Sequence, residues 1–262
     1  MENAGVVKLF PAGTRIVRLF AEPEIPALLG WDDAGMRLCK SRSRGRAVCG
    51  NGVFLKEYVY TSPWDRFRMR FKTPRPFVSL AAAQRLAELG IPTPRVLAAA
   101  RGIAPDGAVH DLTVTAELPP DVRFGDKIAA ELGDGRAVLA RELAPAVSRM
   151  HAGGVVHGDL SMRNWYRLPD GAWGLIDLDG ATVGKVVSER ARTDELARLA
   201  SSCFVCATRA EDGAAELLKF LRAFSEAYQA AGGSVSARRF EARSRALADR
   251  FRIKYLNLGA LE

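Results

Sequence analysis

Short runs of alternating apolar and polar residues dominate the first half of the chain and predict β-strands. The clearest run is Val53–Tyr60, which is rich in β-branched and aromatic residues and follows a Gly-Asn-Gly turn. Residues 40–46 are expected to form a short basic loop between two of the other strands. Those further strands are predicted at 15–20, 36–39, 47–49, 96–99 and 112–117.

A helical spacing of apolar residues predicts one helix at 77–89 and helices through most of the second half, including 137–151. Gly90 and Pro92 follow the first helix and are typical of a helix end. A compact strand-and-loop section at 155–180 interrupts the later helices. The pattern predicts an α+β protein of two lobes, with a small strand-rich lobe and one helix at 1–118 and a helical lobe at 119–262.

The chain is basic, and the excess is concentrated in one segment. The 262 residues carry 38 Lys and Arg against 30 Asp and Glu, which gives a formal net charge of +8. Between Arg37 and Arg75, eleven basic residues are opposed only by Glu57 and Asp65. A local excess of this kind indicates an anionic partner, such as a nucleotide, a phosphorylated substrate, a membrane surface or a nucleic acid.

No segment has the pattern of a secretion signal or of a spanning helix, so we expect a cytoplasmic protein. The N-terminus lacks a basic stretch followed by an apolar run, and no stretch approaches the roughly 18 apolar residues that a spanning helix needs. Four cysteines in a chain of this size do not suggest a disulfide framework. We therefore expect buried free thiols at Cys39, Cys49, Cys203 and Cys206.

The section at 155–180 carries the candidate chemistry. Asp159 and Asn164 lie five residues apart in a predicted loop, and Asp177 ends a short apolar strand at 173–176. Two carboxylates and a carboxamide supply the oxygen ligands that Mg²⁺ prefers when it holds phosphates. A carboxylate that the metal does not use can accept a proton from an attacking hydroxyl.

This arrangement resembles the protein kinase-like fold. The catalytic-loop pattern of that fold is an Asp, four residues and an Asn, which Asp159 and Asn164 match. Asp177 corresponds to its metal-binding Asp, and Lys56 to the strand lysine that pairs with the α- and β-phosphates of ATP. The resemblance implies an ATP-dependent kinase in which Asp159 is the catalytic base and Asn164 and Asp177 bind Mg²⁺.

Further motifs are similar to those of the bacterial lipopolysaccharide kinase family, the Kdo and heptose kinases. The resemblance covers about residues 36 to 205. It implies phosphorylation of a sugar hydroxyl of the lipopolysaccharide inner core, an anionic glycolipid acceptor, and contact with the cytoplasmic face of the inner membrane. The matching motifs are Leu55-Lys56-Glu57-Tyr58 and those at 89–94, 155–164, 176–179 and 192–199.

The resemblance also implies where the nucleotide binds. ATP is expected between the lobes, with its adenine near Glu117 and Leu118 and with Gly45 in the turn that covers the phosphates. That turn has a single glycine, so Arg and Lys side chains are expected to replace part of the usual backbone contacts. The helix at 77–89 lacks a glutamate near Ser79 or Leu80, where the partner of Lys56 belongs.

The remaining site residues have supporting roles in this comparison. His157 and Ser161 belong to the catalytic loop, and Asp194 is expected to anchor that loop from the start of a helix. Asp179 is either a second metal ligand or the cap of a turn. Only 17 residues separate Asp177 from Asp194, which is too short for a regulated activation segment and favours a constitutive kinase of a small or carbohydrate acceptor.

Three alternatives stay open. An aminoglycoside-type phosphotransferase would share the loop chemistry, but the basic surface argues against a cationic acceptor. The missing helix glutamate allows a weak or inactive, kinase-like interaction module. A nucleic-acid binder would use the basic block between Arg37 and Arg75, but it would leave Asp159, Asn164 and Asp177 unexplained.

Two basic segments are candidates for membrane contact. Residues 238–254 have seven basic and two acidic residues, but we expect the apolar face of this helix to pack on the second lobe instead. The run 64–71 alternates basic and apolar residues, which is typical of a half-buried strand or of a solvated segment. The apolar face of the first candidate consists of Phe240, Leu247, Phe251 and Leu258.

Overall fold

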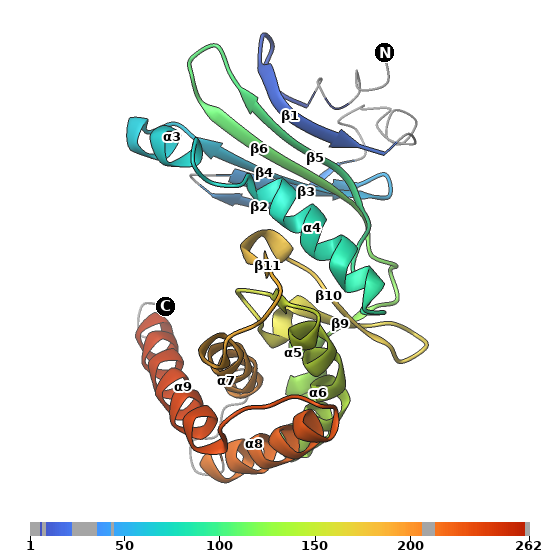
Figure 1. Cartoon of the computed structure of the whole chain (residues 1–262), viewed down its shortest axis with the longest axis vertical. Coiled ribbons are helices and arrows are strands. Elements are labelled where there is room, and N and C mark those ends of the chain that lie inside the picture. Colours follow the sequence, from blue (N-terminus) through green and yellow to red (C-terminus); the bar gives the residue numbers. More distant parts are fainter. Residues whose placement is uncertain (1–5, 7–8, 23–35, 43–44, 206–212, 260–262) are drawn as a thin grey trace. The chain divides into compact units, whose positions relative to one another are not determined.

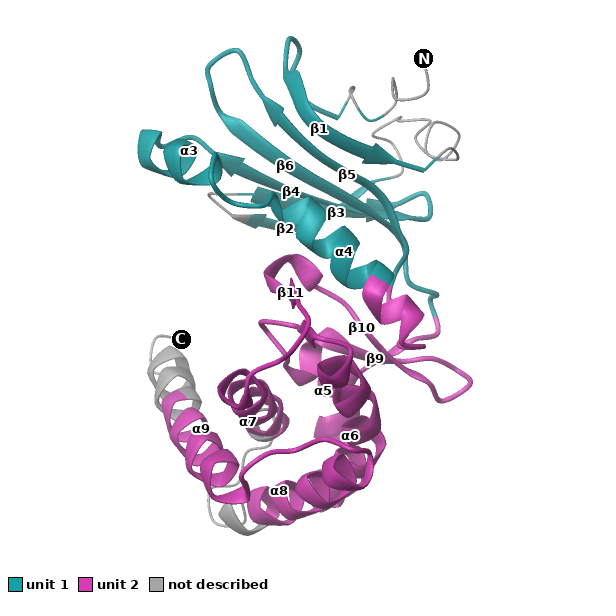
Figure 2. Cartoon of the chain, viewed as in Figure 1, with its two compact units in different colours: residues 1–84, 94–120 teal, residues 85–93, 121–262 magenta. Residues whose placement is uncertain are grey.

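The computed structural model describes residue 6 and residues 9–22, 36–42, 45–205 and 213–259 (Figure 1). The chain divides into two compact units, residues 1–84 with 94–120 and residues 85–93 with 121–262 (Figure 2). The first unit is built on an antiparallel sheet and the second mainly on helices. This agrees with the expected α+β class.

A six-stranded antiparallel sheet forms the first unit, with the strand order β1-β5-β6-β4-β3-β2. Several strands are longer than predicted, and β2 and β3 take up most of the loop expected at 40–46. The pairing of β2 with β3 extends as far as Arg42 and Gly45. The strands are β1 (Arg15–Ala21), β2 (Arg37–Arg42), β3 (Gly45–Gly50), β4 (Val53–Tyr60), β5 (Val96–Ile103) and β6 (Val109–Ala116).

The two faces of the sheet carry different side chains. Val53 and Leu55 of β4 belong to a buried apolar cluster with residues of β5 and β6. Because side chains alternate along a strand, Lys56 and Tyr58 point to the opposite face. Helix α4 (Arg75–Glu88), the helix predicted at 77–89, begins on that face, where the Arg75 guanidinium lies 4.6 Å from the centre of the Tyr58 ring.

Residues 63–69 form helix α3 (Pro63–Met69), where the sequence pattern had indicated a strand or a solvated segment. Ser62 caps this helix by accepting a hydrogen bond from the Asp65 N–H at 3.1 Å, and Pro63 occupies its first turn. No residue of α3 is buried. Its position must therefore depend on contacts other than an apolar face.

One of those contacts comes from a buried ion pair in the sheet. Arg101 of β5 lies opposite Asp111 of β6, and its guanidinium donates to both carboxylate oxygens at 2.6 and 2.7 Å. A further N–H of Arg101 donates to the carbonyl oxygen of Met69 at 2.7 Å. The pair therefore satisfies a carbonyl at the end of α3 and links that end to the sheet.

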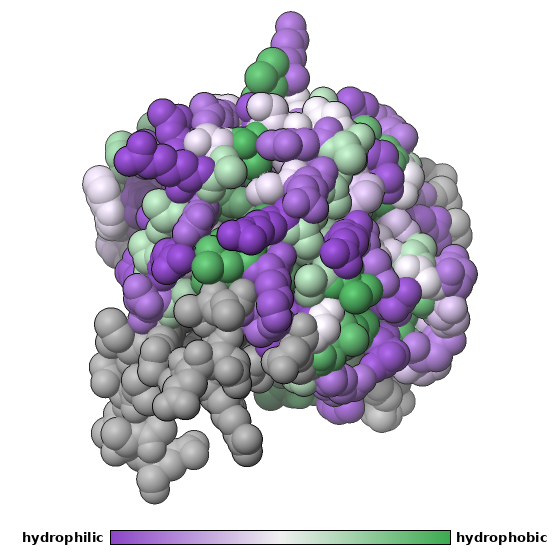
Figure 3. Space-filling view, turned by 90° about the horizontal axis from the view of Figure 1, so that it is seen from below, coloured by the Kyte–Doolittle hydropathy of each residue, from purple (hydrophilic) through white to green (hydrophobic). Residues whose placement is uncertain are grey.

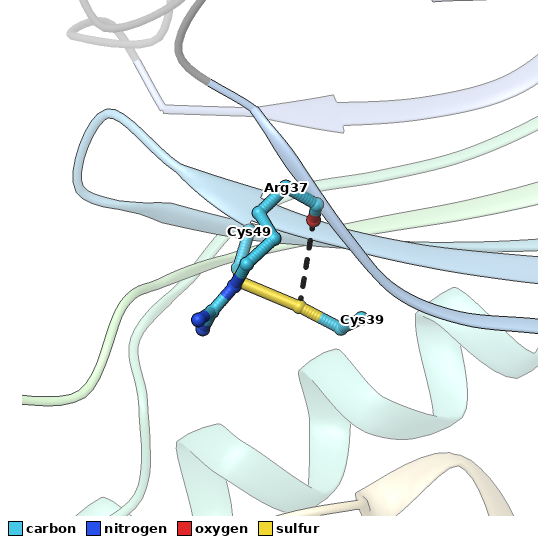
Figure 4. The surroundings of a disulfide bond; sticks show 3 residues. All are labelled: Arg37, Cys39 and Cys49. Atoms are coloured by element: carbon cyan, nitrogen blue, oxygen red, sulfur yellow. Dashed lines mark hydrogen bonds between the residues drawn. A yellow bond between two sulfur atoms is a disulfide. The ribbon is translucent and has the colours of Figure 1, made fainter.

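The expectation that all four cysteines are free thiols is wrong for two of them. Cys39 and Cys49 form a disulfide across the β2–β3 hairpin (Figure 4). A register shift between Leu38 and Lys40 lies at this point, and it brings Cys39 within a Cα–Cα distance of 6.5 Å of Cys49. Cys203 is buried, and Cys206 lies outside the described residues.

The second unit combines helices with two small sheets. Helix α6 packs along α8, α7 packs along α9, and the sheets have the orders β10-β9-β7 and β11-β8. On the face shown in Figure 3, hydrophilic residues surround small hydrophobic groups. The elements are β7 (Arg123–Phe124), α5 (Gly125–Glu131), α6 (Ala137–Ala152), β8 (Val155–Val156), β9 (Trp165–Arg167), β10 (Trp173–Leu175), β11 (Thr182–Val183), α7 (Glu189–Val205), α8 (Gly213–Ala230) and α9 (Ala237–Gly259).

The last helix packs on its own unit, as expected. Phe240 and Ser244 of α9 are buried, and the Ser201 hydroxyl of α7 donates to the Ser244 carbonyl oxygen at 3.0 Å. Phe251 and Leu258 lie outside the described side chains. Among the described residues, no helix is both long and apolar enough to cross a bilayer.

We predict that Arg101→Met lowers the free energy of unfolding by about 3–5 kcal/mol, because it leaves the Asp111 carboxylate buried without its partner. The double variant Arg101→Met with Asp111→Leu should recover most of this loss, since it buries no charge. Chemical denaturation of the three proteins measures both effects. A double variant no more stable than Arg101→Met would contradict this account.

Candidate active site

A single buried carboxylate holds the start of the candidate catalytic loop. Glu195 of α7 accepts the main-chain N–H of His157 at 3.0 Å and that of Gly158 at 2.7 Å. Glu195 is 5% exposed. Without its carboxylate, these N–H groups would be unpaired and would have little access to water. The loop that follows β8 is therefore fixed to the helix core by its backbone, whatever side chains it carries.

Glu195 is itself held by a chain of buried polar groups. The His151 Nε2 lies 3.2 Å from its Oε2, and the His151 Nδ1 lies 2.8 Å from the Tyr228 hydroxyl. Burial raises the pKa of Tyr228 to about 12, so the phenol stays protonated at neutral pH and can donate to His151. The three side chains connect α8, α6 and α7 beneath the loop.

The expectation that Asp194 anchors the loop is wrong by one residue. Asp194 accepts from Arg243 of α9 at 2.7 Å, and its side chain is 41% exposed. Successive residues on a helix point about 100° apart, so Asp194 and Glu195 cannot both face the loop. The packing of α7 turns Glu195 inward and leaves Asp194 at the surface.

The two backbone groups of Ile176 bind the loop and bring Asp177 beside it. The Ile176 N–H donates to the Asn164 carbonyl oxygen at 2.9 Å, and the Ile176 carbonyl lies 2.9 Å from the His157 Nε2. Because a carbonyl can only accept, the Nε2 of His157 carries the proton. Asp177, the next residue, is thereby held beside the loop, two residues after the end of β10. His157 is buried and positions the loop from below.

The backbone of Asp177 has an unusual conformation. Its φ is 65°, in the left-handed region that residues other than glycine seldom adopt, and its side chain is exposed. Such a conformation costs free energy, and strained residues of this kind cluster at functional sites. In this case it follows Ile176, whose N–H and carbonyl are both bound by the loop.

The oxygen atoms brought together suit a hard cation. The Asn164 Nδ2 donates to the Asp159 carbonyl at 2.8 Å, which makes Oδ1 of Asn164 the atom that can ligate a metal. Asp177 adds an exposed carboxylate. Among the described residues, no group of three or more His, Cys, Asp and Glu could hold a metal by itself. Mg²⁺ is typically bound through one or two carboxylates together with phosphates and water, and Asp177 and the Asn164 Oδ1 are oxygen ligands of the kind it prefers.

Two arginines that the sequence analysis did not single out bind the candidate base. The Arg198 Nη1 donates to Asp159 Oδ1 at 3.0 Å, and the Arg163 Nη2 donates to Oδ2 at 3.1 Å. The Asp159 side chain is 34% exposed, so the carboxylate is still open to a substrate. Arg198 lies three residues after Glu195, which places both on the same face of α7.

Gly158 is required by the close approach of two backbone segments. Its φ is 84°, and a Cβ at this position would lie 2.2 Å from the Gly180 carbonyl oxygen. A side chain at position 158 would therefore clash with the backbone of Gly180. Gly180 ends the turn that contains Asp179, a half-buried residue.

The Ser161 hydroxyl is buried in the same loop. Among the described residues it has no hydrogen-bond partner. A polar atom left in this state costs about 1–3 kcal/mol. The supporting role expected for Ser161 is therefore not explained by a contact within the fold.

The remaining candidate residues lie in the first unit. Lys56 is half-buried, with its Nζ 5.3 Å from the centre of the Tyr58 ring, and the Glu117 N–H donates to the Gly52 carbonyl at 2.8 Å. Leu118 is half-buried. A Cβ at Gly45 would lie 2.2 Å from the Glu57 carbonyl oxygen, so strand packing alone explains why position 45 is glycine.

Glu57 follows Lys56 in the strand but points to the other face of the sheet. Its carboxylate lies 2.9 Å from His110 Nδ1 and accepts from Arg46 Nε at 2.8 Å. Burial alone would raise the pKa of Glu57, but these two hydrogen bonds outweigh burial and hold it below its usual value. Glu57 is therefore committed to a structural pair within the sheet.

A protein-family model matches the part of the chain that contains these residues. The model described as lipopolysaccharide kinase (Kdo/WaaP) family matches residues 53–224, which is well over half of the chain. The chain belongs to the lipopolysaccharide kinase (Kdo/WaaP) family. The matched range includes Lys56 and every candidate loop residue from His157 to Asp194, and the kinase-like fold class expected from the sequence is confirmed.

One solved structure agrees with this family at the level of the fold. WaaP in complex with acyl carrier protein matches with a TM-score of 0.57 and 21% identity, over 92% of this chain and 99% of that chain. A crystal structure of WbdD matches with a TM-score of 0.43 and 16% identity, over 60% of this chain and 35% of that chain. No curated protein matches the chain.

We predict that Glu195→Ala strongly destabilises this member of the lipopolysaccharide kinase family, because the N–H groups of His157 and Gly158 would lose their acceptor. The free energy of unfolding should fall by about 2–5 kcal/mol. Asp194→Ala is the matched control and should change stability by less than about 1 kcal/mol, since it breaks only exposed ion pairs. Thermal and urea unfolding compare the two. The reverse order would restore Asp194 as the anchor.

Proposed function

We propose that the protein transfers the γ-phosphoryl group of ATP to a sugar hydroxyl, Kdo or heptose, of the lipopolysaccharide inner core. The observation that carries the proposal is the arrangement of Asp159, Asn164 and Asp177, which hydrogen bonds through Ile176 and His157 hold together in one unit. Membership of the lipopolysaccharide kinase family supports the substrate class. The basic block between Arg37 and Arg75 supports an anionic acceptor and a nucleotide.

In the proposed reaction the protein contributes positioning and charge. Asp159 orients the acceptor hydroxyl and accepts its proton as the oxygen attacks the γ-phosphorus. Asn164 and Asp177 are the residues that would hold Mg²⁺, whose role in such reactions is to neutralise the charge of the phosphates. Lys56 is proposed to pair with the α- and β-phosphates, and Glu117 and Leu118 to contact the adenine.

The two arginines on Asp159 are proposed as positioning residues. A carboxylate that receives one guanidinium N–H on each oxygen has little freedom to rotate, so its remaining lone pairs keep a constant direction. Proton acceptance by a base depends on such geometry before it depends on acidity. Arg198 comes from helix α7, whereas Arg163 lies in the short turn before Asn164.

The acceptor is tested with labelled ATP and four candidates in parallel: Kdo-lipid A, a heptose-containing inner-core lipopolysaccharide, an aminoglycoside and a generic protein. We expect label only on a glycolipid. Asp159→Asn should lower transfer at least about a hundredfold, the scale of a general base. It should keep the thermal shift that ATP and Mg²⁺ produce, since it leaves Asn164 and Asp177 in place.

Three results would overturn parts of this proposal. Label on the aminoglycoside alone would reassign the acceptor class. No nucleotide-dependent thermal shift in the wild type would favour an inactive module. Unchanged turnover by Asp159→Asn would remove Asp159 as the base and leave the acceptor result standing.

We predict that Arg198→Ala lowers kcat about tenfold, with little change in KM for ATP, because the loss concerns the orientation of Asp159 rather than nucleotide binding. Arg198→Lys should recover part of kcat, since an ammonium group can still donate to Oδ1. Steady-state kinetics with varied ATP separates the two constants. A rise in KM with constant kcat would instead make Arg198 a nucleotide-binding residue.

A further inference from the structure

Helix α3 and the residues directly after it expose a cluster of aromatic side chains that the fold does not use. Trp64, Phe67 and Phe71 are 66%, 52% and 77% exposed. The rings of Trp64 and Phe67 stack with centroids 6.1 Å apart, and Phe71 meets Phe67 edge-on at 5.2 Å. We call these three residues the α3 aromatic patch. Among the described residues, no other Trp, Tyr or Phe is as exposed as these.

The patch has no packing role in its own unit. None of the residues of α3 is buried, and the helix is fixed through polar contacts: the Ser62 cap, the Arg101 N–H donated to the Met69 carbonyl, and the Arg66 N–H donated to the Asp106 carbonyl at 3.1 Å. Each exposed ring leaves a large apolar area in water, which is unfavourable. A rigidly held helix with unused rings indicates a partner.

Basic residues lie between and beside the patch residues in the sequence. Arg68, Arg70 and Lys72 are exposed. Asp65 is the sole acidic residue between Pro63 and Lys72. Aromatic rings flanked by arginine and lysine match the interface of a bilayer, where rings lie at the level of the headgroups and cations contact anionic lipids.

We propose that the α3 aromatic patch and its basic neighbours dock the protein on a bilayer that contains anionic lipids. The rings enter the boundary between headgroups and acyl chains, while Arg68, Arg70 and Lys72 remain among the phosphates. Helix α9, the other basic candidate, buries Phe240 and Ser244 within its own unit, so that part of it offers no comparable apolar face. The proposal does not rest on the catalytic assignment, because binding is measured without turnover.

The test is co-flotation of the full chain with vesicles of phosphatidylcholine alone or of phosphatidylcholine with phosphatidylglycerol. We expect binding to the anionic vesicles that weakens with added salt. Replacing Trp64, Phe67 and Phe71 together with Ala should weaken binding by at least about tenfold, and replacing Arg68, Arg70 and Lys72 with Gln should remove most of the salt dependence. Neither change should lower the melting temperature, since all six replaced side chains are exposed.

Two controls test whether the effect belongs to this surface. Replacing Arg238, Arg245 and Arg250 of α9 with Gln removes equal charge elsewhere and should leave most of the binding intact. Trp64→Phe keeps the apolar area, so it should bind like the wild type but lose the blue shift of tryptophan fluorescence that vesicles produce. Binding that survives the aromatic triple variant, or that depends on α9, would overturn the proposal. So would no vesicle binding at all, which would leave an acidic protein surface as the partner.

Discussion

Two main-chain N–H groups at the start of the catalytic loop, those of His157 and Gly158, end on the buried carboxylate of Glu195. The geometry of the rest of the loop depends on this contact. Once His157 is fixed, its ring holds the Ile176 carbonyl, and Asp177 follows beside the loop. Each step uses a backbone group, so the arrangement is set by hydrogen-bond geometry and a few buried acceptors.

In the first unit, too, a few buried polar contacts hold a segment in place: a buried ion pair fixes the end of a surface helix. Arg101 and Asp111 neutralise each other inside the sheet, and the spare N–H of Arg101 extends to the end of α3. A buried pair is weak evidence for stability, because desolvation opposes the attraction. It does fix direction, and here it holds a helix that no apolar face attaches to the sheet. This leaves the rings of α3 free for a partner.

Sequence periodicity failed where two periods fitted the same residues. The run 64–71 alternates basic and apolar side chains, which indicates a strand, yet Trp64, Phe67 and Phe71 also fit a helical spacing. The Ser62-Pro63 pair would have favoured the helix, since both residues are typical of a helix start. The prediction of free thiols at Cys39 and Cys49 failed for another reason. The register shift that brings Cys39 to Cys49 leaves no recognisable pattern in the local sequence.

The sequence alone determined the α+β class, the family and the identity of Asp159, Asn164 and Asp177 as candidate site residues, because fixed spacings within one loop and one strand encode them. The tertiary structure decided which other residues bind and position them. Asp194 and Glu195 are adjacent acidic residues that the sequence alone does not distinguish. They point about 100° apart on α7, and only the packing of that helix turns Glu195 toward the loop. Arg198, on the same face, reaches Asp159 for the same reason.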